Sequence, residues 1–145
     1  MSRLFPLRSS LSAVASNPGS EAASTAVASP RATAGYRKVW REARIFEAKA
    51  QYAFREHASF TQWLLLECLQ ELLEETGDAV SQVAIAERAG LPKSLVSYWM
   101  ALMDEEGLVS RGPALDGRAY RIWMGERGEG VRRRCAEELA EAGLI

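Results

Sequence analysis

The spacing of apolar residues changes once along this chain, and the change separates a helical part from a short β part. From residue 36 onward, apolar residues recur at three- and four-residue steps, the period of a helix with one buried face. Beyond Leu108 they fall on every second position instead, as Tyr120, Ile122 and Met124 do. The pattern predicts a mainly α protein with a small β-hairpin near its C-terminal end.

Two long helices are predicted in the first half. One lies within residues 36–55, with its apolar stripe on Val39, Trp40, Ala43, Phe46, Ala50, Ala53 and Phe54. Ser59 followed by Gln62 is a capping-box pattern, so the next helix is expected to begin after Ser59. Gly77 ends it. Its leucines are distributed around nearly the whole circumference of the helix. This second helix is therefore expected to be buried on several sides.

Residues 81–106 have the pattern of two shorter helices joined by a tight turn. Ser81 is a suitable N-cap for a helix to Ala89, and Gly90 supplies the turn. Pro92 suits the first turn of the next helix, predicted over residues 92–106 and ended by Gly107. Its buried stripe is expected to be Val96, Trp99, Met100 and Met103. The outward face then carries Lys93, Ser94, Ser97, Tyr98 and Ala101.

A hairpin follows, with strands predicted over residues 108–111 and 119–124. Its connection, GPALDG, is made of turn residues. Helix, turn, helix and hairpin in this order are typical of a winged helix-turn-helix, whose second helix fits the DNA major groove while the hairpin reaches the minor groove. Arg118 beside the tip can enter a narrow minor groove or pair with phosphate, with Asp116 placed to orient it. Arg121 is predicted to point outward and contact DNA.

Composition limits the other function classes. The 145-residue chain has a net charge of −1, so DNA affinity must come from local clustering of basic residues. The single histidine, His57, and the two cysteines, Cys68 and Cys135, have no metal-ligand spacing, and a reducing cytoplasm is the simplest compartment. No apolar run approaches the ~18 residues of a membrane span. Without a histidine or cysteine dyad or a glycine-rich phosphate loop, an enzyme is not expected.

Residues 1–35 are rich in serine and alanine and poor in large apolar residues. Such a composition predicts a disordered tail, with the folded domain at residues 36–145. It also overlaps with that of organellar transit peptides, which is the alternative interpretation.

Residues 59–128 resemble the MarR family of bacterial winged-helix transcriptional regulators. The matching pieces are FTQWLLL, SQVAIAERAGLPKSLVS, EEGLVSR, DGR and MGERG. The resemblance implies a helix at residues 92–106 that reads the major groove, and a wing at about residues 108–124 that carries Asp116 and Arg118. It also implies a dimer formed through the first and last helices. Many members release DNA when a phenolic or lipophilic molecule binds, or when a cysteine is oxidised.

The sequence departs from the family at several positions. Leu95 stands where a threonine is frequent, Tyr98 where a basic residue is common, and Gly117 in place of the first wing arginine. Fewer donors predict weaker and less salt-dependent binding than in a typical member. The C-terminal helix, expected at about residues 129–143, replaces a longer helical pair, so dimerisation is expected to depend on residues 36–55.

The sequence therefore predicts a winged helix-turn-helix flanked by N- and C-terminal dimerisation helices, acting as a homodimer on a pseudo-palindromic site. A small-molecule effector is expected between the first two helices, with Trp40, Phe46 and Trp63 as candidate pocket residues that are also candidates for the core. Cys68, among leucines, is expected to be an inert buried thiol; the alternative is a redox sensor.

A winged-helix module that binds protein instead of DNA is the second functional interpretation. The balanced charge, Leu95, Tyr98 and an outward-facing Trp123 would suit it. Trp123 either contacts a partner or DNA backbone, or folds back on the tail or a neighbouring helix.

Overall fold

The computed structural model describes residues 30–113 and 120–145, with side chains from residue 33 onward. The chain divides into two compact units, residues 1–42 and 43–145. Helix α3 (Pro30–Ala53) begins earlier than the predicted residue 36 and supplies the described part of the first unit. In that part Lys38 Nζ lies 3.9 Å from Glu42 Oε1, a pair one helical turn apart. Most of the predicted tail lies outside the described residues.

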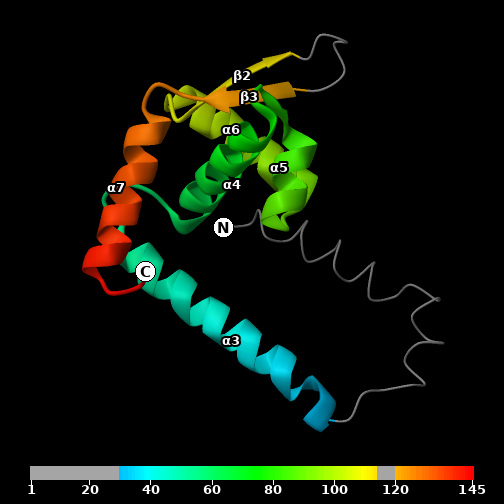
Figure 1. Cartoon of the computed structure of the whole chain (residues 1–145), viewed down its shortest axis with the longest axis vertical. Coiled ribbons are helices and arrows are strands. Elements are labelled where there is room, and N and C mark those ends of the chain that lie inside the picture. The colour runs from blue at the N-terminus through cyan, green and yellow to red at the C-terminus, as the bar shows by residue number, and fades with distance from the viewer. Residues whose placement is uncertain (1–29, 114–119) are drawn as a thin grey trace, which may run out of the picture. The chain divides into compact units, whose positions relative to one another are not determined.

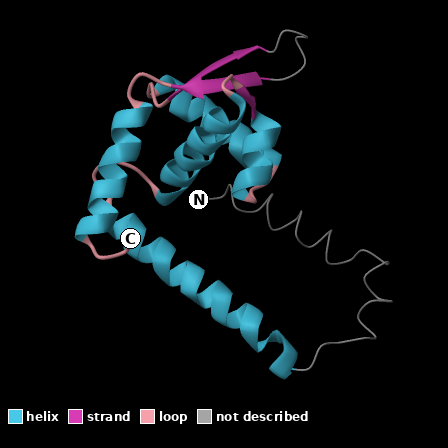
Figure 2. Ribbon diagram, viewed as in Figure 1, coloured by secondary structure: helices cyan, strands magenta, loops and turns pink. Residues whose placement is uncertain are grey.

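The second unit contains the predicted series of helices and strands. After the end of α3 come α4 (Phe60–Thr76), β1 (Val80–Ser81), α5 (Gln82–Ala89), α6 (Lys93–Glu105), β2 (Val109–Pro113), β3 (Tyr120–Met124) and α7 (Gly128–Glu141). Figure 1 shows β2 and β3 side by side next to α6, with α7 leading away from the end of β3. The strands gather at one end of the helices of this unit (Figure 2).

Local capping chemistry sets the helix ends, as predicted. Ser59 Oγ accepts a hydrogen bond from the Gln62 N–H, and the Gln62 side chain accepts one from the Ser59 N–H. Ser81 caps α5 in the same way through the Ala84 N–H. Gly77 ends α4 with a left-handed backbone that other residues adopt only with strain.

A third strand, β1, pairs with the hairpin. The sheet order is β1-β3-β2, all antiparallel, with Val80 and Arg111 on either side of Ile122. Pro92 is the N-cap of α6, one position before the helix, instead of in its first turn as predicted. The fixed φ of proline is compatible with the N-cap position, where the backbone N–H that proline lacks is not needed.

Two apolar clusters hold the second unit together. The larger one forms around α4 and includes the buried stripe of α6; its fully buried members are Leu65, Leu66, Leu69, Ile85, Val96, Met100, Met103 and Ile122. Trp99, predicted in that stripe, is only partly buried. The smaller cluster joins the end of α3 to α7 through Ala50, Phe54, Ala58, Cys135 and Leu139. No helix in the described ranges is both long enough and apolar enough to cross a bilayer.

Candidate nucleic-acid interface

Helix α6 is fixed by one face and leaves the other to solvent. Val96, Met100 and Met103 are fully buried, which anchors the helix in the larger cluster. The opposite face carries the predicted residues: Lys93 and Ser94 are exposed, Ser97 is half-buried, and the Tyr98 side chain is 46% exposed. Ser97 follows Lys93 and Ser94 by four and three residues, and Tyr98 follows Ser94 by four, so the four positions share one side of the helix. The structure therefore brings the four predicted α6 residues together.

The N-terminal end of α6 is open. The Pro92 carbonyl accepts hydrogen bonds from the N–H groups of Leu95 and Val96, and no side chain in the described part of the chain caps the helix. Free N–H groups and the helix dipole favour an anion at such an end, and Lys93 adds a full positive charge there.

The wing holds two predicted residues that the structure places and two that it does not. Arg121 Nη2 donates to the Ala79 carbonyl, so part of its donor set is engaged within the domain. Trp123, 42% exposed, packs over Gly112 of the adjacent strand: a Cβ at Gly112 would lie 3.3 Å from its ring. Asp116 and Arg118 lie outside the described residues. The contact with Gly112 on the neighbouring strand accounts for the position of the Trp123 ring without a contact to a helix or to DNA.

One basic residue of the wing had no predicted role. The guanidinium of Arg111, on β2, stacks on the ring of Tyr120, with its carbon 4.1 Å from the ring centroid. The alternating pattern placed Arg111 in a predicted strand and gave it no contact. An arginine and an aromatic residue at diagonal positions of a predicted hairpin are the signal that could have found the pair.

Both thiols are buried, as predicted for Cys68. Burial, and after it the charge of the neighbouring Glu71, raise the pKa of Cys68 to about 11. Burial likewise raises the pKa of Cys135 to about 12, with Glu138 as the next cause. A protonated, buried thiol is a poor nucleophile, so both environments favour the expected inert thiol over a redox sensor.

The α7 side of the unit is held by ion pairs that the sequence did not predict. Arg132 pairs with Glu129 at 2.8 Å and reaches Glu67 of α4 at 3.3 Å. His57 Nδ1, just after α3, lies 2.7 Å from Glu138 Oε2. The second oxygen of Glu138 is buried and has no hydrogen-bond partner in the described structure.

Two of the three predicted pocket residues, Phe46 and Trp63, belong to an aromatic cluster of the second unit. Phe46 and Trp63 pack against each other, with ring centroids 6.2 Å apart, and Phe54 and Phe60 complete an aromatic cluster. Trp40 belongs to the first unit. Among the described residues, no group of three or more histidine, cysteine or acidic side chains could hold a metal ion.

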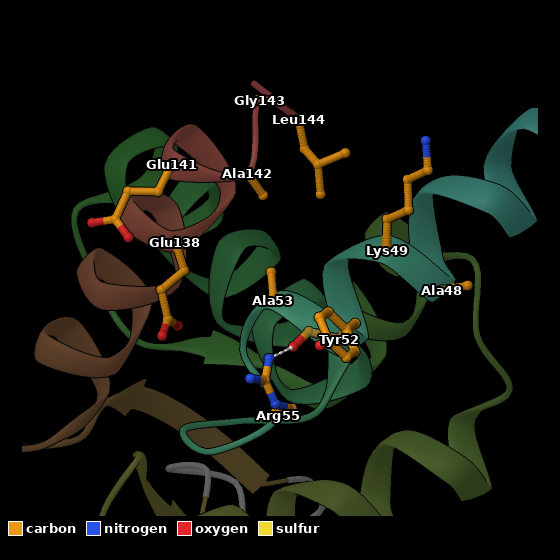
Figure 3. A pocket seen from close by; sticks show the side chains of 10 residues that line it. All are labelled: Ala48, Lys49, Tyr52, Ala53, Arg55, Glu138, Glu141, Ala142, Gly143 and Leu144. Atoms are coloured by element: carbon orange, nitrogen blue, oxygen red, sulfur yellow. Dashed lines mark hydrogen bonds between the residues drawn. The ribbon is translucent and has the colours of Figure 1, made fainter.

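A cavity of about 710 Å³ lies elsewhere, between the second half of α3 and the end of the chain. Figure 3 shows Glu138 and Glu141 on its α7 wall and Lys49 on the α3 wall, with Tyr52 and Leu144 facing the space between them. Arg55 donates to the Tyr52 carbonyl at 2.7 Å, and its guanidinium carbon lies 4.3 Å from the Tyr52 ring centroid. The cavity is thus apolar in part, with opposite charges at its rim.

Comparison with known proteins finds similarity only in structure. No protein-family profile matches the sequence, and no curated protein sequence matches it. The transcriptional regulator MOSR of M. tuberculosis, solved in complex with DNA, has a TM-score of 0.61 at 20% identity over 76% of this chain and 77% of that one. A MarR-family regulator from Rhodococcus sp. RHA1 has a TM-score of 0.63 at 20% identity over 72% of each chain.

The PcaV regulator of Streptomyces coelicolor, solved with its natural ligand, has a TM-score of 0.62 at 19% identity over 81% of this chain and 80% of that one. The predicted fold class, mainly α with a hairpin wing, is confirmed by the order of helices and strands. The chain has the winged-helix fold of the MarR-family transcriptional regulators.

Proposed function

We propose that this protein is a sequence-specific DNA-binding transcriptional regulator, and not an enzyme, that reads the major groove with α6. The observation that carries the proposal is the exposed α6 face, rigidly backed by three fully buried side chains and flanked by a hairpin. Similar folds support it, because MOSR was solved in complex with DNA. A helix of 13 residues is long enough to lie in a major groove while its neighbours contact the backbone.

The α6 face divides into two kinds of contact. Ser97 and Tyr98, one turn into the helix, are proposed to meet base edges, where a hydroxyl can donate and accept. Lys93 and Ser94, at the open end, are proposed to bind phosphate. On the wing, Arg118 would enter the minor groove, with Asp116 orienting it and Arg121 contributing its remaining donors.

The proposed active form is a homodimer. Two copies would set two α6 helices about one DNA turn apart on a pseudo-palindrome. Apolar side chains left exposed at the second half of α3 and at the chain end support self-association: Ile45 is 50% exposed, Tyr52 70% and Ile145 71%. Inserting five base pairs between half-sites turns one of them to the far side of the helix, so affinity should fall to that of a single half-site.

A small-molecule effector would bind the cavity of about 710 Å³. Its volume falls in the range of small-molecule sites, and it combines apolar and charged lining groups. It borders α3 and α7, so a ligand there would change the separation of the two reading heads without touching either. PcaV, a protein with the same fold, was solved with its natural ligand.

Selection of bound fragments from sheared genomic DNA at physiological salt tests the proposal. The wild-type protein should enrich a palindromic motif, and Arg118→Ala should recover the same motif more weakly. Such a regulator would act in the cytoplasm, on nucleoid DNA. If neither protein enriches any sequence, the proposal fails, and the exposed Tyr98 and Trp123 favour the alternative, a winged-helix module that binds protein.

A further inference from the structure

The stacked pair of Arg111 and Tyr120 is the starting point. In the β2–β3 register Arg111 faces Ile122, and Tyr120 faces Pro113. Tyr120 is therefore the diagonal neighbour of Arg111 on the same face of the hairpin, close enough for a long side chain to cover its ring. The resulting cation–π contact fixes the plane of the guanidinium.

The pair continues the buried face of the wing outward. Val109 and Ile122, the preceding residues on that face, belong to the larger cluster together with Val96 and Met100 of α6. Strand β2 also contacts α6 directly. Arg111 and Tyr120 thus lie past the last buried pair, on the side of the wing that is turned toward the reading helix.

Arg111 differs in its partners from Arg88, Arg121, Arg127 and Arg132. Arg88 and Arg132 are each held by two carboxylates. Arg121 and Arg127 each donate to a backbone carbonyl. In residues 30–113 and 120–145 no hydrogen-bond acceptor or acid meets Arg111, although the residue is half-buried. Stacking orients its donors, and within these described ranges they remain available to an external anion.

We infer that Arg111, held in place by Tyr120, is a phosphate-binding site for the DNA backbone where it passes between α6 and the wing. The inference rests on the proposed function and adds a contact to it. A planar guanidinium donates two parallel N–H groups to a phosphodiester, and an aromatic ring beneath it leaves the outward edge free for that purpose. Because a phosphate is present at every step of the duplex, the contact adds affinity without sequence preference.

The test measures affinity for the selected operator and for an unrelated duplex of equal length, by fluorescence anisotropy across a salt series. Arg111→Ala should weaken binding to both duplexes by a similar factor, about tenfold. It should also reduce the slope of log affinity against log salt by about 0.9, the amount for one phosphate contact. Arg134→Ala, which removes an exposed arginine from α7, is the matched charge control and should change neither quantity.

Substitutions of the ring test the stacking. Tyr120→Leu should weaken binding about threefold, because the guanidinium keeps its charge and loses its orientation. Tyr120→Phe keeps the ring and should bind as the wild type does, and Arg111→Lys should keep the salt slope while losing affinity.

The outcomes separate the two proposals. Failure of the wild type to prefer its operator would overturn the proposed function itself. Normal operator binding with an unchanged salt slope in Arg111→Ala, or an equal loss in Arg134→Ala, would overturn this inference alone. Unchanged affinity in Tyr120→Leu would overturn the role given to the ring.

Discussion

Gly128, the first residue of α7, lies directly against the backbone carbonyl of Leu108: a Cβ on Gly128 would stand 2.1 Å from that oxygen. The same carbonyl accepts the Gly125 N–H at 2.9 Å, and the Arg127 N–H donates to Gly107 at 3.0 Å. Residues 107 and 108 connect α6 to β2. The start of α7 is therefore bonded, backbone to backbone, to the joint between the reading helix and the wing.

We expect Gly128→Ala to lower the free energy of unfolding by about 3 kcal/mol, because a backbone carbonyl cannot move aside as a flexible side chain can. Gly130→Ala is the matched control two positions along the same helix, where a Cβ meets nothing within 4 Å. It should raise stability by up to ~1 kcal/mol through helix propensity. Urea unfolding followed by circular dichroism measures both; equal effects of the two substitutions would refute the close contact.

The helices were predictable because residues near each helix end determine where the helix begins or stops. Ser59 with Gln62, Ser81, Gly77 and Gly90 each act within a few residues, and each performs the predicted role. The close approach of Gly128 to Leu108 depends instead on how α7 returns to the α6–β2 joint. Nothing in the neighbouring residues of either position signals such a contact.

His57 and Glu138 are expected to be energetically coupled. Their nitrogen and oxygen are 2.7 Å apart, and the side chains are only 28% and 16% exposed. His57→Ala leaves both oxygens of Glu138 without a partner, since the other is already unpaired in the described structure. We expect a loss of about 2 kcal/mol in the free energy of unfolding.

A double-mutant cycle with Glu138→Ala should show coupling of about 1 kcal/mol or more. Lys38 and Glu42, an exposed pair 3.9 Å apart, provide the control and should show almost none. Equal coupling in the two cycles would contradict the distinction between a half-buried and an exposed pair.

The pH dependence of stability should report the burial of Cys68. Its folded-state pKa is raised from 9.0 to about 11, so the folded protein keeps a proton that the unfolded chain releases. Stability is therefore unaffected below about pH 9 and falls as the pH rises toward about 11. Cys68→Ala should show a shallower fall over this range in urea titrations at successive pH values. Parallel curves for the two proteins would show that the thiol titrates normally.

The candidate site was predictable on α6 and less so on the wing. Helical period alone puts Lys93, Ser94, Ser97 and Tyr98 on the face opposite the buried stripe, and the structure agrees. On the wing, the alternation of apolar and polar residues predicts which face of the hairpin a side chain lies on, but not which residue it contacts. It could not show that Arg121 would donate to Ala79, forty-two residues earlier in the chain, or that Arg111 would stack on the ring of Tyr120.

Selection of sites from a random-sequence library with the wild type and with Tyr98→Ala tests whether α6 reads DNA sequence. The wild type should select a palindromic motif, and the variant should show a changed or relaxed base preference at the same position in both half-sites. One lost base contact corresponds to about 1–3 kcal/mol of discrimination. Identical motifs from the two proteins would show that Tyr98 does not meet base edges. The absence of any motif from the wild type would show that α6 does not read DNA sequence.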